Sequence, residues 1–86
     1  MDEIQKLRKR VDEIDDEVLK ALCERVRVCK AIGESKKRQD MPIRDSSREN
    51  EVYRRIKEKS AQSQLDPTQI ERVYREIVNM CSAVQE

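Results

Sequence analysis

The apolar positions in the first part of the chain recur with the period of an α-helix, over a helix predicted from about Asp2 to Lys37. At about 100° per residue, they form one broad stripe: Ile4, Leu7, Val11, Ile14, Val18, Leu19, Leu22, Val26, Cys29 and Ile32. Four charged residues fall on the same stripe: Arg8, Asp15, Arg25 and Lys36. A helix that buries this stripe needs anions for its cations, and the chain offers few at matching positions. Either the cationic side chains extend to solvent, or another molecule supplies the negative charge.

A second, shorter helix is predicted after a connection that contains Pro42, because proline disfavours a helical residue before it. This helix starts near Asp45 or Ser46, and the spacing of Ser46 and Glu49 is that of a capping box. It ends within residues 61–64, where the apolar period stops.

The third helix opens at Asp66 and Pro67, a capping residue followed by proline at the first helical position. Its apolar face comprises Ile70, Val73, Tyr74, Ile77, Val78, Cys81 and Val84. Gln85 lies on this same face, one turn beyond Cys81.

These lengths predict one all-α domain over residues 1–86, built from one long and two shorter helices. The long helix should extend about 50 Å, and the other two only about half as far. One copy therefore cannot cover its own apolar stripe, whereas a second copy with the long helices antiparallel can. A long helix with a frayed end is the simpler alternative.

Composition excludes several classes of function. Charged residues make up 43% of the chain, but the net charge is only +1 and aromatic residues are 2%, which does not fit a nucleic-acid-binding surface. No segment is long and apolar enough for a membrane span or signal peptide, so we expect a cytoplasmic protein. There is no His, and the three Cys residues lack metal-site spacing. We expect no metal, no cofactor and no acid–base or covalent mechanism.

The two cations nearest the end of the long helix form a candidate binding face. Arg25 and Lys36 are eleven residues apart, so they point within about 20° of each other. Between them lie Val28, Cys29 and Ile32, which form an apolar wall. A compact ligand with separated negative groups would fit such a face.

Each of these residues also has a structural interpretation. Arg8 and Arg25 could lay their aliphatic stems over the core, and Lys36 could interact with the helix dipole. Glu49 could be only the acid of the capping box, and Gln85 could be solvated.

The sequence resembles the all-helical class of chorismate mutase over essentially its whole length. The resemblance rests on residues 7–15 (LRKRVDEID), residues 22–25 (LCER), Lys36, residues 42–49 (PIRDSSRE) and the pair Cys81 and Gln85. It implies an intertwined antiparallel homodimer that rearranges chorismate to prephenate without a cofactor.

The resemblance also implies roles for individual residues. Arg25 and Arg8 of the partner subunit would bind the two carboxylates of the substrate. Lys36 would contact a carboxylate and the ether oxygen, and Gln85 would donate a hydrogen bond to that oxygen.

Glu49 would hold the ring hydroxyl, the backbone of Asp45 would lie nearby, and Arg48 would line the site. Cys81 departs from the family pattern, in which Ser is familiar at this place, and a thiol is a weak hydrogen-bond donor.

Two alternatives remain open at this stage. The first is the lyase that splits isochorismate into salicylate and pyruvate on the same fold. The second is a helical dimerisation module with no catalytic activity.

Overall fold

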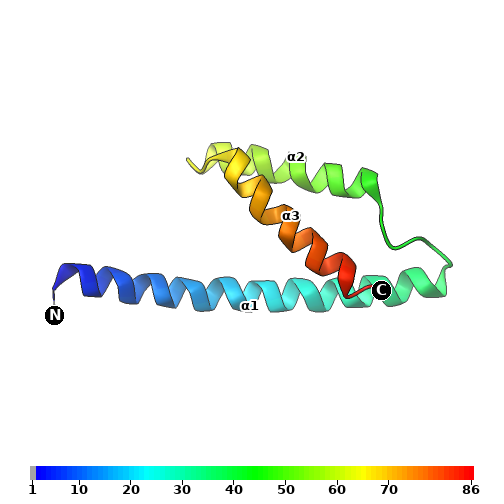
Figure 1. Ribbon diagram of the computed structural model, residues 1–86, viewed down its shortest axis with the longest axis horizontal. Helices are drawn as coiled ribbons and strands as arrows, with labels where there is room; N and C mark the ends of the chain where they lie inside the picture. The colour runs from blue at the N-terminus through cyan, green and yellow to red at the C-terminus, as the bar shows by residue number, and fades with distance from the viewer. Residues whose placement is uncertain (1) are drawn as a thin grey trace.

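The computed structural model describes residues 2–86 and is all-helical over that range. It contains α1 (Glu3–Arg38), α2 (Ser46–Gln62) and α3 (Pro67–Ala83). The all-α class and the plan of one long and two shorter helices are therefore confirmed. The molecule measures 57 × 24 × 15 Å, and α1 sets the longest dimension (Figure 1).

The ends of α1 and α3 follow local capping chemistry. The side chain of Asp2 accepts a hydrogen bond from the Gln5 backbone N–H at 2.8 Å, which caps α1. Asp66 caps α3 in the same way and Pro67 occupies the first turn, as the sequence predicts. At the C-terminal end of α1, Asp40 adopts a left-handed conformation (φ 55°) that ends the helix.

The predicted capping box of α2 is wrong. Asp45, not Ser46, is the capping residue, because its extended backbone places its carboxylate 3.0 Å from the backbone N–H of Arg48. Ser46 is already the first helical residue. Glu49 is therefore one position too late for the capping-box acid, and its carboxylate is not used to cap the helix.

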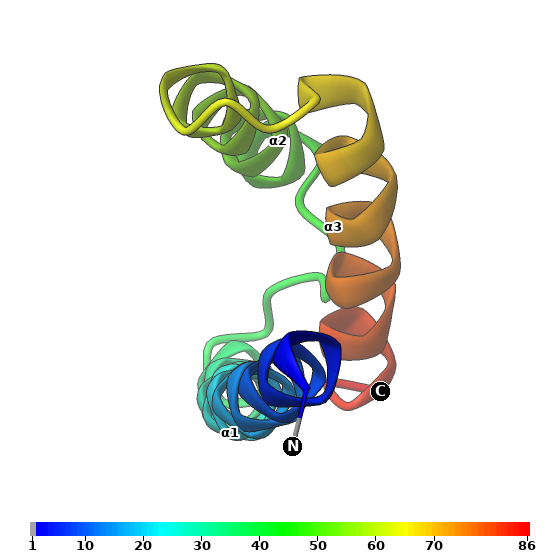
Figure 2. The same cartoon turned by 90° about the vertical axis from the view of Figure 1, so that its left-hand side faces the viewer.

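Helix α3 connects the other two helices. It packs against α2, then diverges from it and reaches α1 with its C-terminal end, whereas α1 and α2 do not pack on each other within residues 2–86 (Figures 1 and 2). The small core lies between α2 and α3: Val52, Tyr53, Ile56 and Val78, with Ile70 and Tyr74 against them. Viewed along α1, helix α3 runs from α2 to α1, so the three helices form a C shape (Figure 2).

Charged side chains on one edge strengthen the pairing of α2 with α3. Glu71 pairs with Lys57 across the two helices and with Arg75 at 3.0 Å. The guanidinium of Arg75 lies 4.4 Å from the ring centroid of Tyr53. The hydrogen bond from Lys57, and then that from Arg75, hold the pKa of the Glu71 carboxyl below its usual value.

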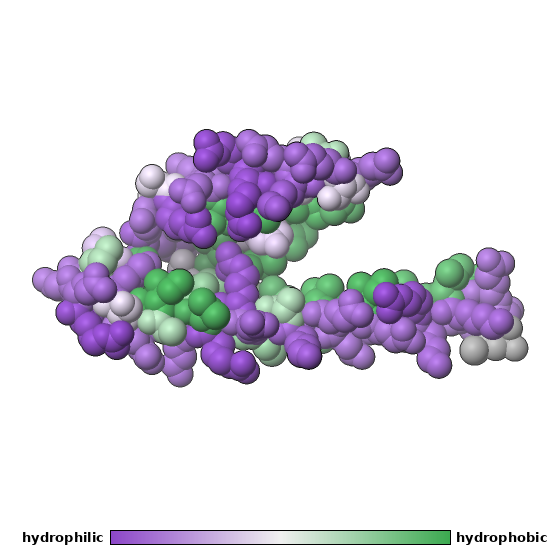
Figure 3. All heavy atoms as spheres, turned by 180° about the vertical axis from the view of Figure 1, so that it is seen from behind, coloured by the Kyte–Doolittle hydropathy of each residue, from purple (hydrophilic) through white to green (hydrophobic). Residues whose placement is uncertain are grey.

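The N-terminal half of α1 projects beyond α2 and α3, and its apolar stripe is uncovered. Six side chains on it are 41–60% exposed: Ile4, Leu7, Val11, Ile14, Val18 and Leu19. Figure 3 shows apolar atoms along the upper edge of this projecting arm, on the same side of α1 as α2 and α3. Gly33 is the single buried residue that α1 contributes within residues 2–86. One copy therefore leaves its stripe exposed, as the helix lengths predict. None of the described helices is both long enough and apolar enough to cross a membrane.

Candidate active site

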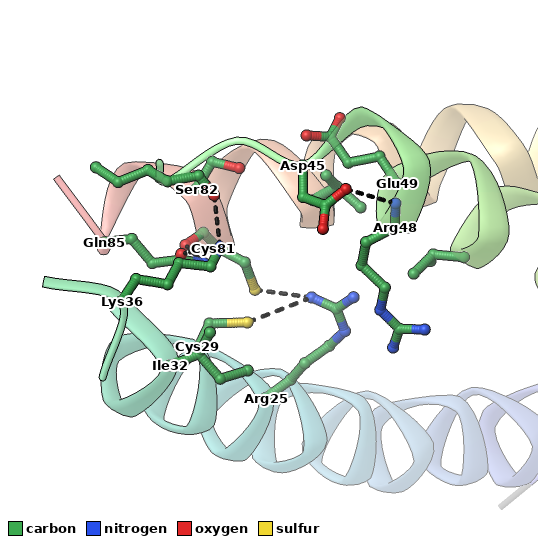
Figure 4. A pocket seen from close by; sticks show the side chains of 13 residues that line it. Arg25, Cys29, Ile32, Lys36, Asp45, Arg48, Glu49, Cys81, Ser82 and Gln85 are labelled. Carbon is green, nitrogen blue, oxygen red and sulfur yellow. Dashed lines mark hydrogen bonds between the residues drawn. The ribbon is translucent and has the colours of Figure 1, made fainter. Parts of the chain in front are cut away.

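A pocket of about 300 Å³ lies where the C-terminal half of α1, the start of α2 and the end of α3 meet (Figure 4). It is lined by seven of the eight residues predicted from the sequence: Arg25, Lys36, Asp45, Arg48, Glu49, Cys81 and Gln85. The eighth, Arg8, is exposed on the projecting arm and does not line the pocket of its own chain. A cavity of this size is at the lower end of the range for small-molecule sites.

Arg25 enters the pocket from α1 and points toward two sulfur atoms. Its Nη1 atom lies 2.7 Å from the Sγ of Cys81 on α3 and 4.0 Å from the Sγ of Cys29 on its own helix (Figure 4). A thiol sulfur is a weak acceptor. The guanidinium is thus oriented by the pocket wall but is not neutralised by it.

Lys36 connects three parts of the chain. Its Nζ atom donates to the backbone carbonyl of Ile43 at 2.5 Å and to the Oε1 atom of Gln85 at 2.9 Å. Gln85 in turn donates from Nε2 to the backbone carbonyl of Cys81 at 3.1 Å. The second hydrogen of that amide nitrogen remains available to a ligand.

Glu49 and Arg48 lie at the α2 side of the pocket. The Glu49 carboxylate is 24% exposed and lies 3.4 Å from the guanidinium of Arg44. Arg44 also donates to the side chain of Asn79 on α3 at 3.4 Å, so it links the start of α2 to α3. Arg48 pairs with Glu51 of the same helix at 2.5 Å, and both side chains are more than half exposed.

The thiol of Cys29 is strongly disfavoured as an anion. Burial raises its pKa to about 11, and the neighbouring thiol of Cys81 acts in the same direction. Arg25 and Lys36 lower it, but by less. Cys29 is therefore neutral near pH 7 and contributes no negative charge to the pocket.

The pocket consequently contains two half-buried cations without a protein anion. Among residues 2–86, the hydrogen-bond acceptors of Arg25 and Lys36 are cysteine sulfurs, a backbone carbonyl and an amide oxygen, and none is a carboxylate. A half-buried cation with only neutral partners favours an anionic ligand. The geometry therefore fits a small molecule with at least two negative groups.

Gly33 and Arg44 also shape this site, although the sequence did not identify them as site residues. Gly33 on α1 lies directly against Gln85, and Arg44 contacts Glu49. The signal for Gly33 was present, since it is the one glycine of the chain and lies inside a long helix. Nothing in the sequence distinguished Arg44 from the other arginines near it.

Comparison with known proteins agrees with this geometry. The sequence profile of the family described as chorismate mutase type II matches residues 7–86. A bifunctional chorismate mutase/prephenate dehydratase of Aquifex aeolicus is 35% identical over 89 residues, which cover 100% of this chain and 25% of that protein. The chain thus spans only a quarter of that relative's length.

Two archaeal proteins are similar over nearly their whole lengths. A chorismate mutase of Methanocaldococcus jannaschii is 28% identical over 86 residues, which cover 100% of this chain and 87% of that protein. The solved structure of a conserved hypothetical protein from Pyrococcus furiosus matches with a TM-score of 0.79 and 30% identity, covering 96% of this chain and 95% of that one. The chain therefore belongs to the chorismate mutase type II family of all-helical isomerases.

Proposed function

We propose that this protein rearranges chorismate to prephenate in the pocket between α1, α2 and α3. The observation that carries this proposal is the pair of cations, Arg25 and Lys36, which face the pocket without a carboxylate partner. Chorismate carries two carboxylates on a compact ring and side chain, so it supplies the missing negative charge. Membership of the chorismate mutase type II family supports this choice of substrate.

The reaction is an intramolecular pericyclic rearrangement, so the protein has to hold one conformer and stabilise its transition state. Arg25 binds one carboxylate, and Arg8 of the partner subunit binds the other. Bidentate contacts from guanidinium groups fix orientation as well as charge. Holding the reacting ends of the substrate together in this way lowers the barrier by positioning.

The breaking C–O bond leaves negative charge on the ether oxygen. Lys36 and the available N–H of Gln85 are the donors that stabilise this charge, and the 2.9 Å hydrogen bond from Lys36 Nζ to Gln85 Oε1 already holds the two side chains together. Such donors are effective because they need no rearrangement during the reaction. Glu49 accepts a hydrogen bond from the ring hydroxyl, a role open to it because it does not cap α2. Arg48 and the backbone of Asp45 complete the wall, and Cys81 orients Arg25.

The protein works as a homodimer whose long helices pair antiparallel, and a second copy of the chain covers the exposed stripe of α1. The exposed apolar side chains of α1 run from Ile4 to Ile32, so their midpoint is position 18. In an antiparallel pair centred there, positions 8 and 28 lie opposite each other, because each is ten residues from the centre. Arg8 then reaches the partner's pocket between Arg25 and Lys36.

The direct test is to incubate the purified protein with chorismate and to follow the loss of its absorbance, with the product identified by NMR. We expect prephenate from the wild type, little from Lys36→Ala, and wild-type activity from Lys37→Ala. Lys37 is the matched control because it neighbours Lys36 but is exposed and does not line the pocket. A folded protein without turnover would refute the proposal and favour the dimerisation module. Salicylate and pyruvate from isochorismate, with chorismate unchanged, would identify the lyase instead.

The shared site has its own test by complementation. Arg8→Ala and Arg25→Ala homodimers each lack one cation in both sites. A mixed dimer has one site that lacks both cations and one that is complete. Activity should therefore return on mixing, with about half the sites of the wild type per dimer. If heterodimers form, as checked by native mass spectrometry, and activity does not return, Arg8 does not act across the interface.

A further inference from the structure

Gly33 stands out because nothing in its own backbone requires glycine. It lies inside α1, where glycine costs about 1 kcal/mol relative to alanine. Its φ angle is not positive, so the left-handed conformation that favours glycine is not the reason. The reason has to be the space beside it.

That space is filled by Gln85. A Cβ atom on residue 33 would lie 2.7 Å from the Cγ of Gln85 and 2.8 Å from both its Cα and its Cβ. Because the Cα atom belongs to the backbone, a change of rotamer cannot relieve this contact. Any side chain at position 33 therefore displaces the end of α3 from α1.

Gln85 depends on this close approach for its orientation. It lies just beyond Val84, the residue that caps the end of α3, yet it is only 8% exposed. Lys36 is one turn along α1 from Gly33, on the same side of the helix, and donates to the Oε1 atom of Gln85. An ammonium group donates and never accepts, so this bond selects the orientation in which Nε2 is directed away from Lys36.

We propose that Gly33 is a positioning residue for the Gln85 amide. By carrying no side chain, it lets the end of α3 rest against α1, where Lys36 fixes the amide and leaves one of its N–H groups available to the pocket. This inference rests on the proposed function, in which that N–H stabilises the ether oxygen. Gly33 itself does not line the pocket.

The size of the effect follows from the contact distances. Ordinary contacts begin at 3.4 Å, so a Cβ at 2.8 Å reaches an ordinary contact after a displacement of about 0.6 Å, the difference between these distances. Displacements of about 1 Å can cost about 10²-fold in rate. We expect Gly33→Ala to lower kcat by about 10- to 100-fold and to change KM by less than about threefold, because Arg25 still binds the carboxylate.

The experiment compares Gly33→Ala with Glu34→Ala, a neighbouring exposed position on α1. In a Gln85→Ala background, adding Gly33→Ala should change kcat by less than about twofold, because the donor that Gly33 positions is already absent. The inference would be overturned if the losses in kcat from Gly33→Ala and Gln85→Ala were additive. It would also be overturned if Gly33→Ala raised KM by as large a factor as it lowered kcat. Thermal unfolding of each variant identifies any general loss of structure.

A second readout does not depend on turnover. In ¹⁵N-labelled protein without ligand, the side-chain amide signals of Gln85, assigned by their loss in Gln85→Ala, should shift in Gly33→Ala and stay unchanged in Glu34→Ala. Unmoved signals in Gly33→Ala would refute the positioning role even if the enzyme is active. Shifted signals in a protein without mutase activity would uphold the role and refute the proposed reaction alone.

Discussion

The most demanding prediction concerns the exposed stripe of α1 and its proposed partner, a second copy of the chain. Val18 lies at the midpoint of this stripe and is 50% exposed in one copy. In an antiparallel pair centred there, the two copies of Val18 face each other. Val18→Glu would therefore place two carboxylates side by side in the contact between the two α1 helices. Lys20→Glu changes the charge on the opposite face of α1 and serves as the control.

The expected magnitude follows from the exposure. Full burial of a valine side chain contributes about 1.5–3 kcal/mol, so the half that remains exposed in one copy accounts for about 1 kcal/mol. The dimer loses this contribution twice, and two carboxylates about 4 Å apart repel by about 1 kcal/mol even in water. A total of at least about 3 kcal/mol weakens association by about 10²-fold or more.

Sedimentation velocity over a range of concentrations measures this change directly. We expect the wild type and Lys20→Glu to be dimeric, and Val18→Glu to dissociate at concentrations where the wild type does not. Turnover should fall with dissociation, since each pocket then lacks Arg8 of the partner subunit. The antiparallel pairing of the α1 helices would be refuted if the wild type stayed monomeric. It would also be refuted if Val18→Glu dimerised as tightly as Lys20→Glu.

Three further predictions concern the pocket. Lys36→Ala should lower kcat by about 10²–10³-fold, the effect of losing one transition-state donor. The control variant Lys37→Ala should leave steady-state kinetics unchanged. Equal kinetics for both variants would remove Lys36 from the mechanism. Cys81→Ser should keep or raise activity, since a hydroxyl is a better hydrogen-bond partner for Arg25 than a thiol. A strong loss of activity together with a lower Tm would instead assign Cys81 to packing. In the wild type, Cys29 should react slowly with a thiol reagent at pH 8 and faster as pH rises toward its pKa of about 11, whereas the exposed Cys23 should react promptly. Mass spectrometry of the labelled peptides separates the cysteines, and fast Cys29 labelling at pH 8 would contradict the raised pKa.

The sequence was sufficient to predict the helices because their signals are local. The apolar period and the Asp66–Pro67 start need no knowledge of distant residues, and the structure places α3 where they indicate. The start of α2 was harder, since Asp45 and Ser46 are adjacent residues that both cap helices well. Only the backbone conformation of Asp45 decides between them.

That one-residue difference matters for the candidate site. With Ser46 as the cap, Glu49 would have had a structural role that competed with substrate binding. With Asp45 as the cap, Glu49 instead contacts Arg44 and lines the pocket. The structure therefore removes the capping interpretation of Glu49, although its contact with a ring hydroxyl stays a prediction.

The contacts between α1 and α3 could not be predicted from patterns within either helix. Cys81 and Gln85 share a face of α3, and Arg25 and Lys36 share a face of α1, but periodicity does not say where the two faces meet. The meeting point depends on how closely the helices approach, and that approach is possible because Gly33 carries no side chain. Considered within α1 alone, Gly33 has only a cost in helix stability, because its benefit lies in Gln85, a residue far along the chain.

The charge pattern of α1 gave the strongest indication of function, and the structure gives it a physical form. A carboxylate beside Arg25 or Lys36 would neutralise these cations and compete with an anionic substrate. The chain instead orients them with a thiol and with carbonyl and amide oxygens, which fix direction without cancelling charge. Hydrogen bonds to neutral groups are weaker than those to carboxylates, so the substrate's carboxylates can replace them. The pocket thus keeps its cations in place and uncompensated until a ligand with matching negative groups arrives, which is the electrostatic requirement of a site that binds a dianion.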